Sequence, residues 1–151
     1  MHRYLLAGTA LATLAAPLAA QTLVEDKRTQ PIRTSELNDG TGDAVKVTDT
    51  GSIELTAGSA IIVDSDHDAV NEGKIVVANA DGASGIEVIG DRQADIVSSG
   101  TITIDETYTP EDIDNDQDLD GPFAVGRDRA AIRVRGNLTG DIRHTGTITV
   151  E

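Results

Sequence analysis

One stretch of this chain concentrates side chains that could bind a metal ion. Residues 105–121 contain eight carboxylates and no lysine or arginine. Within this stretch Asp116, Asp118 and Asp120 alternate along the chain and are followed by Gly121, which is the spacing that opens a calcium loop. Carboxylates on alternate residues can converge on one hard cation, while glycine permits a sharp turn. The predicted calcium ligands are Asp114, Asp116, Asp118 and Asp120.

The resemblance of this stretch to an EF-hand is incomplete. The twelfth position of an EF-hand loop carries a bidentate glutamate, and Arg127 stands there instead. No helical periodicity flanks the loop either. Two interpretations therefore stay open. One is a looser aspartate-rich loop that binds extracellular calcium with a Kd of about 10⁻⁴–10⁻³ M. The other is a solvated acidic loop that only aids solubility.

A second acidic group surrounds a histidine at residues 64–68, Asp-Ser-Asp-His-Asp. It could bind a metal ion, but Asp and Ser are also the residues that stabilise turns through local hydrogen bonds. We predict a turn there. A further histidine, His144, lies in a segment that resembles an earlier part of the chain. The equivalent residue there is Ser98, so histidine is not required at that position. No serine–histidine–aspartate or cysteine–histidine constellation can be assembled from the sequence.

Four arginines follow the acidic stretch at positions 127, 129, 133 and 135. Parallel β-helices that cleave polysaccharides carry carboxylates and basic residues on one exposed sheet, which makes the cluster suggestive of such an enzyme. The simpler interpretation is that these arginines compensate the charge of the acidic stretch. We expect charge compensation, and we expect the chain not to be an enzyme.

The elements that must position these residues repeat along the chain. Residues 86–104 align with residues 132–150 without a gap at an offset of 46 residues. The alignment places Gly100 on Gly146, each followed by Thr-Ile-Thr. Self-similarity of this kind is typical of stacked repeats and indicates a β-solenoid.

Short runs of alternating aliphatic and polar residues predict strands with one buried face. No part of the chain after residue 20 shows a helical period, so the predicted class is all-β. Antiparallel hairpins with turns at Asp81-Gly82 and Asn137 are the competing arrangement. The alternating aliphatic pairs are Val45 and Val47, Ile53 and Leu55, Ile75 and Val77, Ile86 and Val88, Ile102 and Ile104, Ile132 and Val134, and Ile148 and Val150.

The spacing of one glycine favours a parallel β-helix. Gly51, Gly73, Gly100 and Gly146 precede similar strands and are separated by 22, 27 and 46 residues. One coil of such a helix takes about twenty residues or slightly more. The longest spacing becomes one coil when an insertion at residues 105–123 is set aside. The sequence thus predicts about four to five coils and one acidic insertion, with each glycine at a corner where a side chain would crowd the next coil.

Composition and charge limit where this chain works. Residues 1–20 have the basic start, apolar run and small-residue end of a secretory signal peptide. Residues 21–43 are polar and rich in turn formers, and we predict an N-terminal leader or cap; residues 44–151 would form the coils. Removing the signal takes away Arg3 and no acidic residue, so the net charge changes from −14 to −15. Such a charge disfavours nucleic acid as a partner, and the absence of cysteine excludes a disulfide framework.

Three further runs resemble a known family. They are Asp-Leu-Asp-Gly-Pro-Phe-Ala-Val-Gly at 118–126, Ile-Arg-Val at 132–134 and Gly-Thr-Ile-Thr-Val-Glu at 146–151. Together with the signal peptide and the glycine-marked coils, they are similar to the passengers of large bacterial autotransporters (type V secretion) of sphingomonad-type alphaproteobacteria. The resemblance implies export across the inner membrane and display on the cell surface, on the outer membrane or outside the cell. It also implies a C-terminal membrane barrel that this chain lacks, so we expect a fragment truncated at its C-terminus.

The expected function is accordingly that of a surface-displayed β-helical stalk or adhesin-type scaffold. Its partner would be a surface ligand or glycan that the sequence does not identify, and it would meet a membrane only through the missing barrel. The alternatives are an extracellular polysaccharide-active β-helix enzyme and a small calcium-dependent binding module. Calcium is the only cofactor that the sequence suggests.

Overall fold

The computed structural model describes residues 21–107, 111–120 and 126–151, and in these ranges it is all-β without a helix. The predicted class is therefore confirmed. The predicted signal peptide, residues 1–20, lies outside the described residues. Short strands form because β-branched residues alternate with polar ones and are interrupted every few residues by Gly, Asp or Asn.

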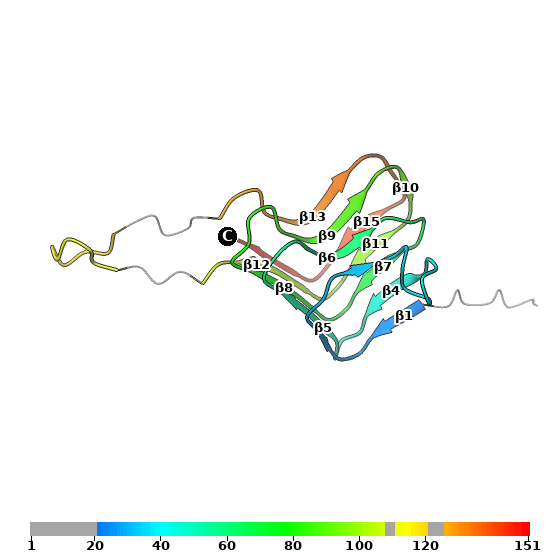
Figure 1. Cartoon of the computed structure of the whole chain (residues 1–151), viewed down its shortest axis with the longest axis horizontal. Coiled ribbons are helices and arrows are strands. Elements are labelled where there is room, and N and C mark those ends of the chain that lie inside the picture. Colours follow the sequence, from blue (N-terminus) through cyan, green and yellow to red (C-terminus); the bar gives the residue numbers. More distant parts are fainter. Residues whose placement is uncertain (1–20, 108–110, 121–125) are drawn as a thin grey trace, which may run out of the picture.

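The strands belong to three larger sheets and one small one, and the chain visits the three larger sheets in the same order each time (Figure 1). Sheet A contains β1 (Gln21–Val24), β4 (Ala44–Val47), β7 (Ala69–Asn71), β11 (Ile96–Ser98) and β15 (Ile142–His144). Sheet B contains β2 (Lys27–Arg28), β5 (Ser52–Leu55), β8 (Lys74–Ala78), β12 (Thr101–Asp105) and β16 (Thr147–Val150). Sheet C contains β3 (Ile32–Arg33), β6 (Ser59–Val63), β9 (Ser84–Ile89) and β13 (Ala130–Arg135). The small sheet pairs β10 (Arg92–Gln93) with β14 (Leu138–Thr139).

Neighbouring strands in every one of these sheets run parallel. The two halves of the sequence repeat pair in register: Ile102 lies beside Ile148, and Ile86 beside Ile132. Strands in a hairpin would be antiparallel, so the hairpin alternative is wrong for these strands. The turn formers at Asp81-Gly82 and Asn137 instead connect strands that lie in different sheets.

The core lies between the three sheets and consists of aliphatic residues stacked in columns. One column runs through Ile53, Ile75 and Ile102, all fully buried, to Ile148. Each side chain in a column covers its neighbour on the next strand, so no large ring is needed to fill the centre. Burial of each of these side chains contributes about 1.5–3 kcal/mol.

A ladder of glycines forms the corner between sheets A and B. A Cβ placed on Gly73 would lie 2.3 Å from the carbonyl oxygen of Gly51, and one on Gly100 would lie 2.1 Å from that of Gly73. The same contact at Gly146, to the oxygen of Gly100, would be 1.9 Å. Real Cβ atoms do not approach oxygen so closely, so the prediction that these glycines occupy crowded corners is confirmed.

Strands begin earlier than the sequence suggests. The polar segment at residues 21–43 already contains β1, β2 and β3, which pair parallel with β4, β5 and β6. These three strands lie within the segment that we predict to be an N-terminal leader or cap. The alternation is hard to see because β2 and β3 have two residues each and include Lys27, Arg28 and Arg33.

The acidic insertion leaves the sheets after β12 and returns before β13. Asp105, its predicted first residue, still belongs to β12 and pairs with Ala78. Its predicted last residue, Phe123, lies outside the described residues. Figure 1 places residues 111–120 well away from the three sheets. We call residues 111–120 the tip.

Candidate functional site

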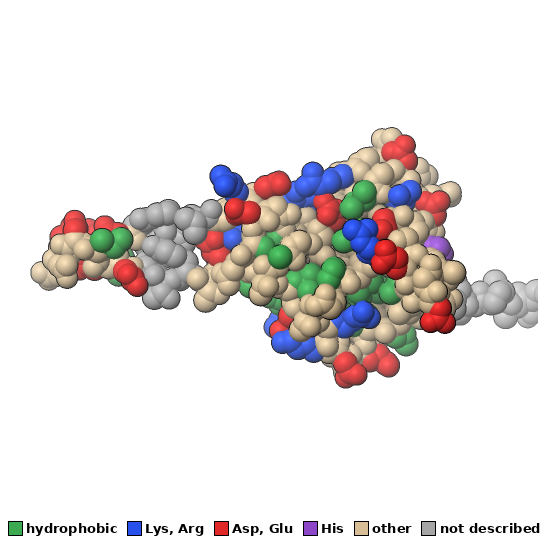
Figure 2. Space-filling view, in the orientation of Figure 1, with side chains coloured by type: hydrophobic (Ala, Val, Ile, Leu, Met, Phe, Trp, Pro, Cys, Tyr) green, Lys and Arg blue, Asp and Glu red, His purple; other side chains and the backbone are tan. Residues whose placement is uncertain are grey.

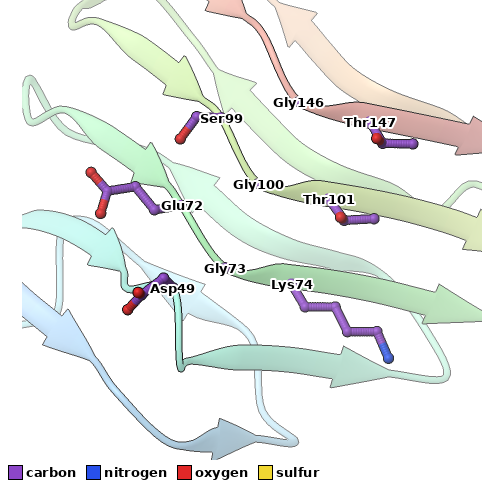
Figure 3. Close-up of a pocket in the computed structure, with 9 residues that line it drawn as sticks. All are labelled: Asp49, Glu72, Gly73, Lys74, Ser99, Gly100, Thr101, Gly146 and Thr147. Carbon is purple, nitrogen blue, oxygen red and sulfur yellow. The ribbon is translucent and has the colours of Figure 1, made fainter.

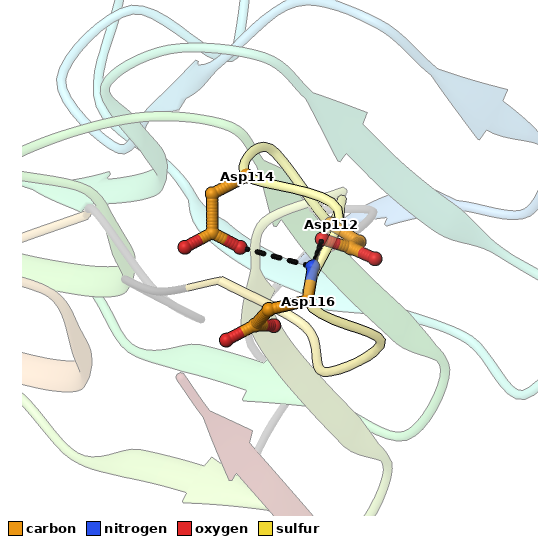
Figure 4. Close-up of side chains that lie close together, drawn as sticks. All are labelled: Asp112, Asp114 and Asp116. Carbon is orange, nitrogen blue, oxygen red and sulfur yellow. Dashed lines mark hydrogen bonds between the residues drawn. The ribbon is translucent and has the colours of Figure 1, made fainter.

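The tip is organised by hydrogen bonds from its backbone to its own carboxylates. The backbone N–H of Asp116 donates to Oδ1 of Asp112 at 3.2 Å and to Oδ1 of Asp114 at 3.3 Å. Gln117 N–H donates to Oδ2 of Asp112 at 3.1 Å. Asn115 and Gln117 have positive φ angles of 62° and 80°, which Asn accommodates better than most residues. This local winding gathers three carboxylates on one side of the loop (Figure 4).

These carboxylates are close enough to share a cation. One oxygen from each of Asp112, Asp114 and Asp116 lies within 4.8 Å of the other two. Asp112 is half-buried and Asp114 and Asp116 are exposed, so solvent can supply further oxygen ligands. The arrangement therefore offers three hard ligands, fewer than the six to eight that calcium takes, with water completing the shell.

The structure brings together only part of the predicted calcium set. Asp114 and Asp116 belong to the group of three carboxylates. Asp118 instead donates its backbone N–H to Oδ1 of Asp116 at 3.1 Å. Asp120 closes the loop: its Oδ2 accepts the N–H of Ile113 at 2.6 Å, and its own N–H donates to the carbonyl of Glu111 at 3.0 Å.

Asp112 is the member of the group that the sequence-based selection missed. The EF-hand spacing aligns the motif with Asp116 as its first ligand, and the predicted set reaches back only to Asp114. The signal was present, because aspartate alternates over all of 112–120 and the alternation starts at Asp112. The glycine of the motif, Gly121, lies outside the described residues.

A buried ion pair stands where the insertion meets the sheets. Nη2 of Arg129 lies 2.8 Å from Oε2 of Glu106, and the two side chains are only 4% and 8% exposed. The same carboxylate oxygen accepts the N–H of Gly126 at 2.8 Å. Arg129 also donates to the carbonyls of Ala80 and Glu151, at 3.0 and 2.6 Å. These contacts fix both ends of the insertion to the body of the protein.

The end of sheet B beside this ion pair is itself acidic. The pKa of Glu151 is raised above its ordinary value, first by the hydrogen bond between its side chain and that of Asp105. Repulsion from the Asp105 carboxylate and from the nearby Glu106 raises this pKa further.

The other arginines of the cluster pair with carboxylates of the body. Arg135 Nε lies 2.6 Å from Oε1 of Glu87, and Arg133 Nη1 lies 3.0 Å from Oδ2 of Asp128. Arg127 lies 3.5 Å from Asp81 in an exposed pair. Among the four arginines, Arg129 is the one whose ion pair joins the insertion, through Glu106.

Glu87 is the carboxylate that pairs with Arg135 at 2.6 Å. Burial acts to raise the pKa of Glu87, but hydrogen bonds from Ser59 and Arg135 and the charge of Arg135 outweigh burial and hold it below the ordinary value. A general acid needs a raised pKa at neutral pH. The environment of Glu87 therefore suits an ion pair better than acid catalysis.

The histidine-containing group at residues 64–68 forms the connection between β6 and β7, as predicted for a turn. Oδ1 of Asp64 accepts the N–H of Ser35 at 3.0 Å, and Arg33 pairs with Oδ2 at 2.7 Å. Burial acts to raise the pKa of Asp64, but these hydrogen bonds outweigh it and lower the pKa. His67 Nδ1 lies 3.0 Å from the hydroxyl of Ser65.

A shallow groove of about 440 Å³ follows the glycine ladder. Because the corner has no side chains, the groove floor is backbone, and the residues before and after the glycines form its walls (Figure 3). Glu72 is paired with Lys46 at 2.8 Å on one side. The groove walls consist of Asp49, Glu72, Ser99, Lys74, Thr101 and Thr147.

Charge separates the tip from the rest of the surface. Figure 2 shows acidic side chains gathered on the tip, whereas acidic and basic side chains are mixed over the sheets.

No family model, curated protein or solved structure matches the chain. The described residues include no helix long and apolar enough to cross a membrane.

Proposed function

We propose that this chain is a β-solenoid of about four to five coils with one acidic insertion, and that it serves as the N-terminal part of an exported autotransporter passenger. In this role it is a stalk or adhesin-type scaffold on the cell surface, without catalytic activity of its own. One observation supports the proposal most. The chain passes through sheets A, B and C in a fixed order, and each strand pairs parallel with its counterpart from the previous passage.

The stacked arrangement suits a scaffold for physical reasons. Each passage contacts mainly the passages before and after it, so length can be added without redesigning a central core. A cysteine-free chain can cross membranes unfolded and then fold outside the cell without an oxidant. The contacts that attach the insertion lie at its base, at Glu106 and Thr107, so the sequence of the tip can vary while the columns stay unchanged.

Export is testable through processing of the N-terminus. The 151-residue chain with a C-terminal epitope is expressed in a Gram-negative host, and mass spectrometry determines its first residue. We expect cleavage after Ala20 and recovery outside the cytoplasm. A matched variant with Leu11→Arg, which interrupts the apolar run, should keep Met1 and stay in the cytoplasm. Retention of Met1 in the unchanged protein would contradict the proposal.

Surface display needs its own experiment. The chain is fused upstream of an autotransporter translocator unit, with an epitope inserted after Gln117 in the tip. The epitope should bind antibody on intact cells and disappear after external protease treatment. An epitope that becomes accessible only after cell lysis would contradict display.

A second candidate function, calcium binding by the tip, is supported by the convergence of Asp112, Asp114 and Asp116. Isothermal titration with calcium is expected to give a Kd of about 10⁻⁴–10⁻³ M. The triple substitution of these residues by Asn should abolish binding. Asp118→Asn is the matched control and should leave binding within two-fold. No heat of binding at millimolar calcium, or equal effects of the two variants, would exclude this site.

A further inference from the structure

The groove along the glycine ladder has two chemically different walls. Figure 3 places Asp49, Glu72 and Ser99 on the side of sheet A, and Lys74, Thr101 and Thr147 on the side of sheet B. The glycines between the walls carry no side chain, so a bound molecule can approach the backbone. The groove extends from just before β5, across β8 and β12, to β16, and three strand spacings make it about 14 Å long.

Four polar side chains that line this groove have hydrogen-bonding groups that are not in use. Within the ranges that the structure describes, no hydrogen bond or ion pair involves the side chains of Asp49, Ser99, Thr101 and Thr147. A hydroxyl group can donate one hydrogen bond and accept two, whereas a carboxylate only accepts. The walls therefore suit a ligand that carries many groups able both to donate and to accept, as sugar hydroxyls do.

The groove disfavours other common classes of ligand. None of the residues that line it is aliphatic or aromatic, so an apolar molecule would gain little by entering. A polypeptide cannot add a strand there, because the carbonyls of Gly73 and Gly100 already accept N–H groups of the next strand, at 2.8 and 3.1 Å. Two carboxylates against one ammonium group, together with the net charge of −14, disfavour an anionic ligand.

We propose that the groove binds an extended, neutral oligosaccharide whose chain runs along the glycine ladder. The hydroxyls of Ser99, Thr101 and Thr147 exchange hydrogen bonds with sugar hydroxyls, and the Asp49 carboxylate accepts hydrogen bonds from others. Thr101 and Thr147 occupy equivalent positions on neighbouring strands, so two sugars of one chain can contact the same kind of wall at once, which raises the affinity. This inference rests on the proposed adhesin role and names the class of molecule that the adhesin holds.

The shape and charge of the groove select the probe. Because the groove follows the stacking direction of the strands, the extended β-1,4-linked chain of cellotetraose should fit it. Maltotetraose has the same composition but a curved chain, and it should bind at least five-fold more weakly. Tetragalacturonic acid should not bind, because its carboxylates would lie beside Asp49 and Glu72.

Binding is measured by NMR titration of the ¹⁵N-labelled 151-residue chain with each tetrasaccharide. Cellotetraose should shift the amide signals of Gly73, Gly100 and Gly146, which form the groove floor. The signals of the tip, residues 111–120, should not change, because the tip lies well away from the sheets. The shifts at increasing sugar concentration give the Kd.

Matched threonine variants test the proposed contacts. Thr101→Val combined with Thr147→Val removes two hydroxyls from the groove wall. Thr103→Val combined with Thr149→Val removes two hydroxyls from the same face of the same strands, outside the groove. The first pair should weaken cellotetraose binding at least five-fold, and the second should leave the Kd within two-fold. Both pairs should unfold at similar temperatures by circular dichroism, because Val and Thr are both favourable in strands.

Four results would overturn the proposal. They are the absence of shifts at the groove glycines with millimolar cellotetraose, equal binding of the acidic tetrasaccharide, equal binding of maltotetraose, and equal weakening by the two threonine pairs. None of these results would affect the proposed export and display, which are measured by N-terminal processing and by antibody binding to intact cells. Failure of display with sugar binding intact would instead leave the groove as a binding site and remove the adhesin role.

Discussion

The stacked strands and the acidic tip are held together by opposite means. In the sheets, each residue lies beside the equivalent residues of the neighbouring strands, as Ile75 lies beside Ile53 and Ile102. In the tip, Asp112 and Asp120 accept hydrogen bonds from backbone groups at most seven residues away. The strands bury an aliphatic core, whereas Ile113 in the tip is 73% exposed.

This difference predicts that the two regions respond differently to substitution. We expect the columns to tolerate few substitutions, because each side chain packs against the equivalent side chains of the strands on both sides. We expect the tip to tolerate more substitutions, because the hydrogen bonds of its carboxylates are local. A change in the non-repeating tip should therefore leave the stacked strands intact.

The largest effect is expected from a side chain in the glycine ladder. Gly100→Val would place Cβ about 2.1 Å from the carbonyl of Gly73, so strands β8 and β12 must separate. We expect more than about 5 kcal/mol of destabilisation, measured by urea denaturation followed by circular dichroism. Gly58→Ala is the matched control: Gly58 has positive φ but open space around it, so its cost should be about 1 kcal/mol. Similar costs at both glycines would contradict the crowded corner.

The next largest effect concerns the junction between the two regions. Glu106→Ala leaves the Arg129 guanidinium buried without its partner and should cost about 4 kcal/mol in free energy of unfolding. Arg127→Ala removes an exposed pair with Asp81 and should cost less than about 0.5 kcal/mol. A cost for Glu106→Ala no larger than that for Arg127→Ala would show that the junction is solvated.

A matched pair of isoleucines compares the two regions directly. Ile75→Ala opens a cavity in a column and should cost about 3 kcal/mol. Ile113→Ala in the tip should change the unfolding free energy by less than about 0.5 kcal/mol. Chemical denaturation of both variants measures the contrast, and equal losses would mean that the tip belongs to the core.

The smallest effect is a dependence on pH. The lowered pKa of Glu87 means that its ion pair with Arg135 stabilises the fold fully above the ordinary value of 4.5. The contribution is lost as pH falls through the lowered folded value. Glu87→Gln should therefore remove about 0.5–1 kcal/mol at pH 7 and flatten the decline in melting temperature below pH 4.5. A steeper acid decline in the variant would contradict this sign.

Much of the strand arrangement could be predicted because it repeats. The glycines at 51, 73, 100 and 146 and the isoleucines after them identify equivalent positions, and equivalent positions pair. β2 and β3 could not be predicted in this way, because two-residue strands with charged residues show no alternation. The ion pair between Glu106 and Arg129 could not be predicted either. The two residues belong to no repeat, and they meet only because the insertion brings its two ends together.

The candidate metal site was only partly predictable for a related reason. An alternating run of aspartates indicates ligands but does not say which of them turn toward one another. Asp118 and Asp120 are drawn into hydrogen bonds around the loop, whereas Asp112 joins the group. The choice depends on positive φ angles at Asn115 and Gln117, which the residue types permit but do not require.

The central claim, parallel stacking at an offset of 46 residues, is tested most directly by a cross-link. The chain has no cysteine, and Thr103 and Thr149 are register partners on β12 and β16. With both changed to Cys, their Cα atoms lie about 5 Å apart, so a disulfide should form on mild oxidation. In the control, Cys at Thr103 and Thr147, the Cα atoms are about 8 Å apart on the same face, which is too far. Efficient cross-linking of 103 with 149 but not with 147 is the predicted result; the reverse, or equal cross-linking of both pairs, would contradict the account.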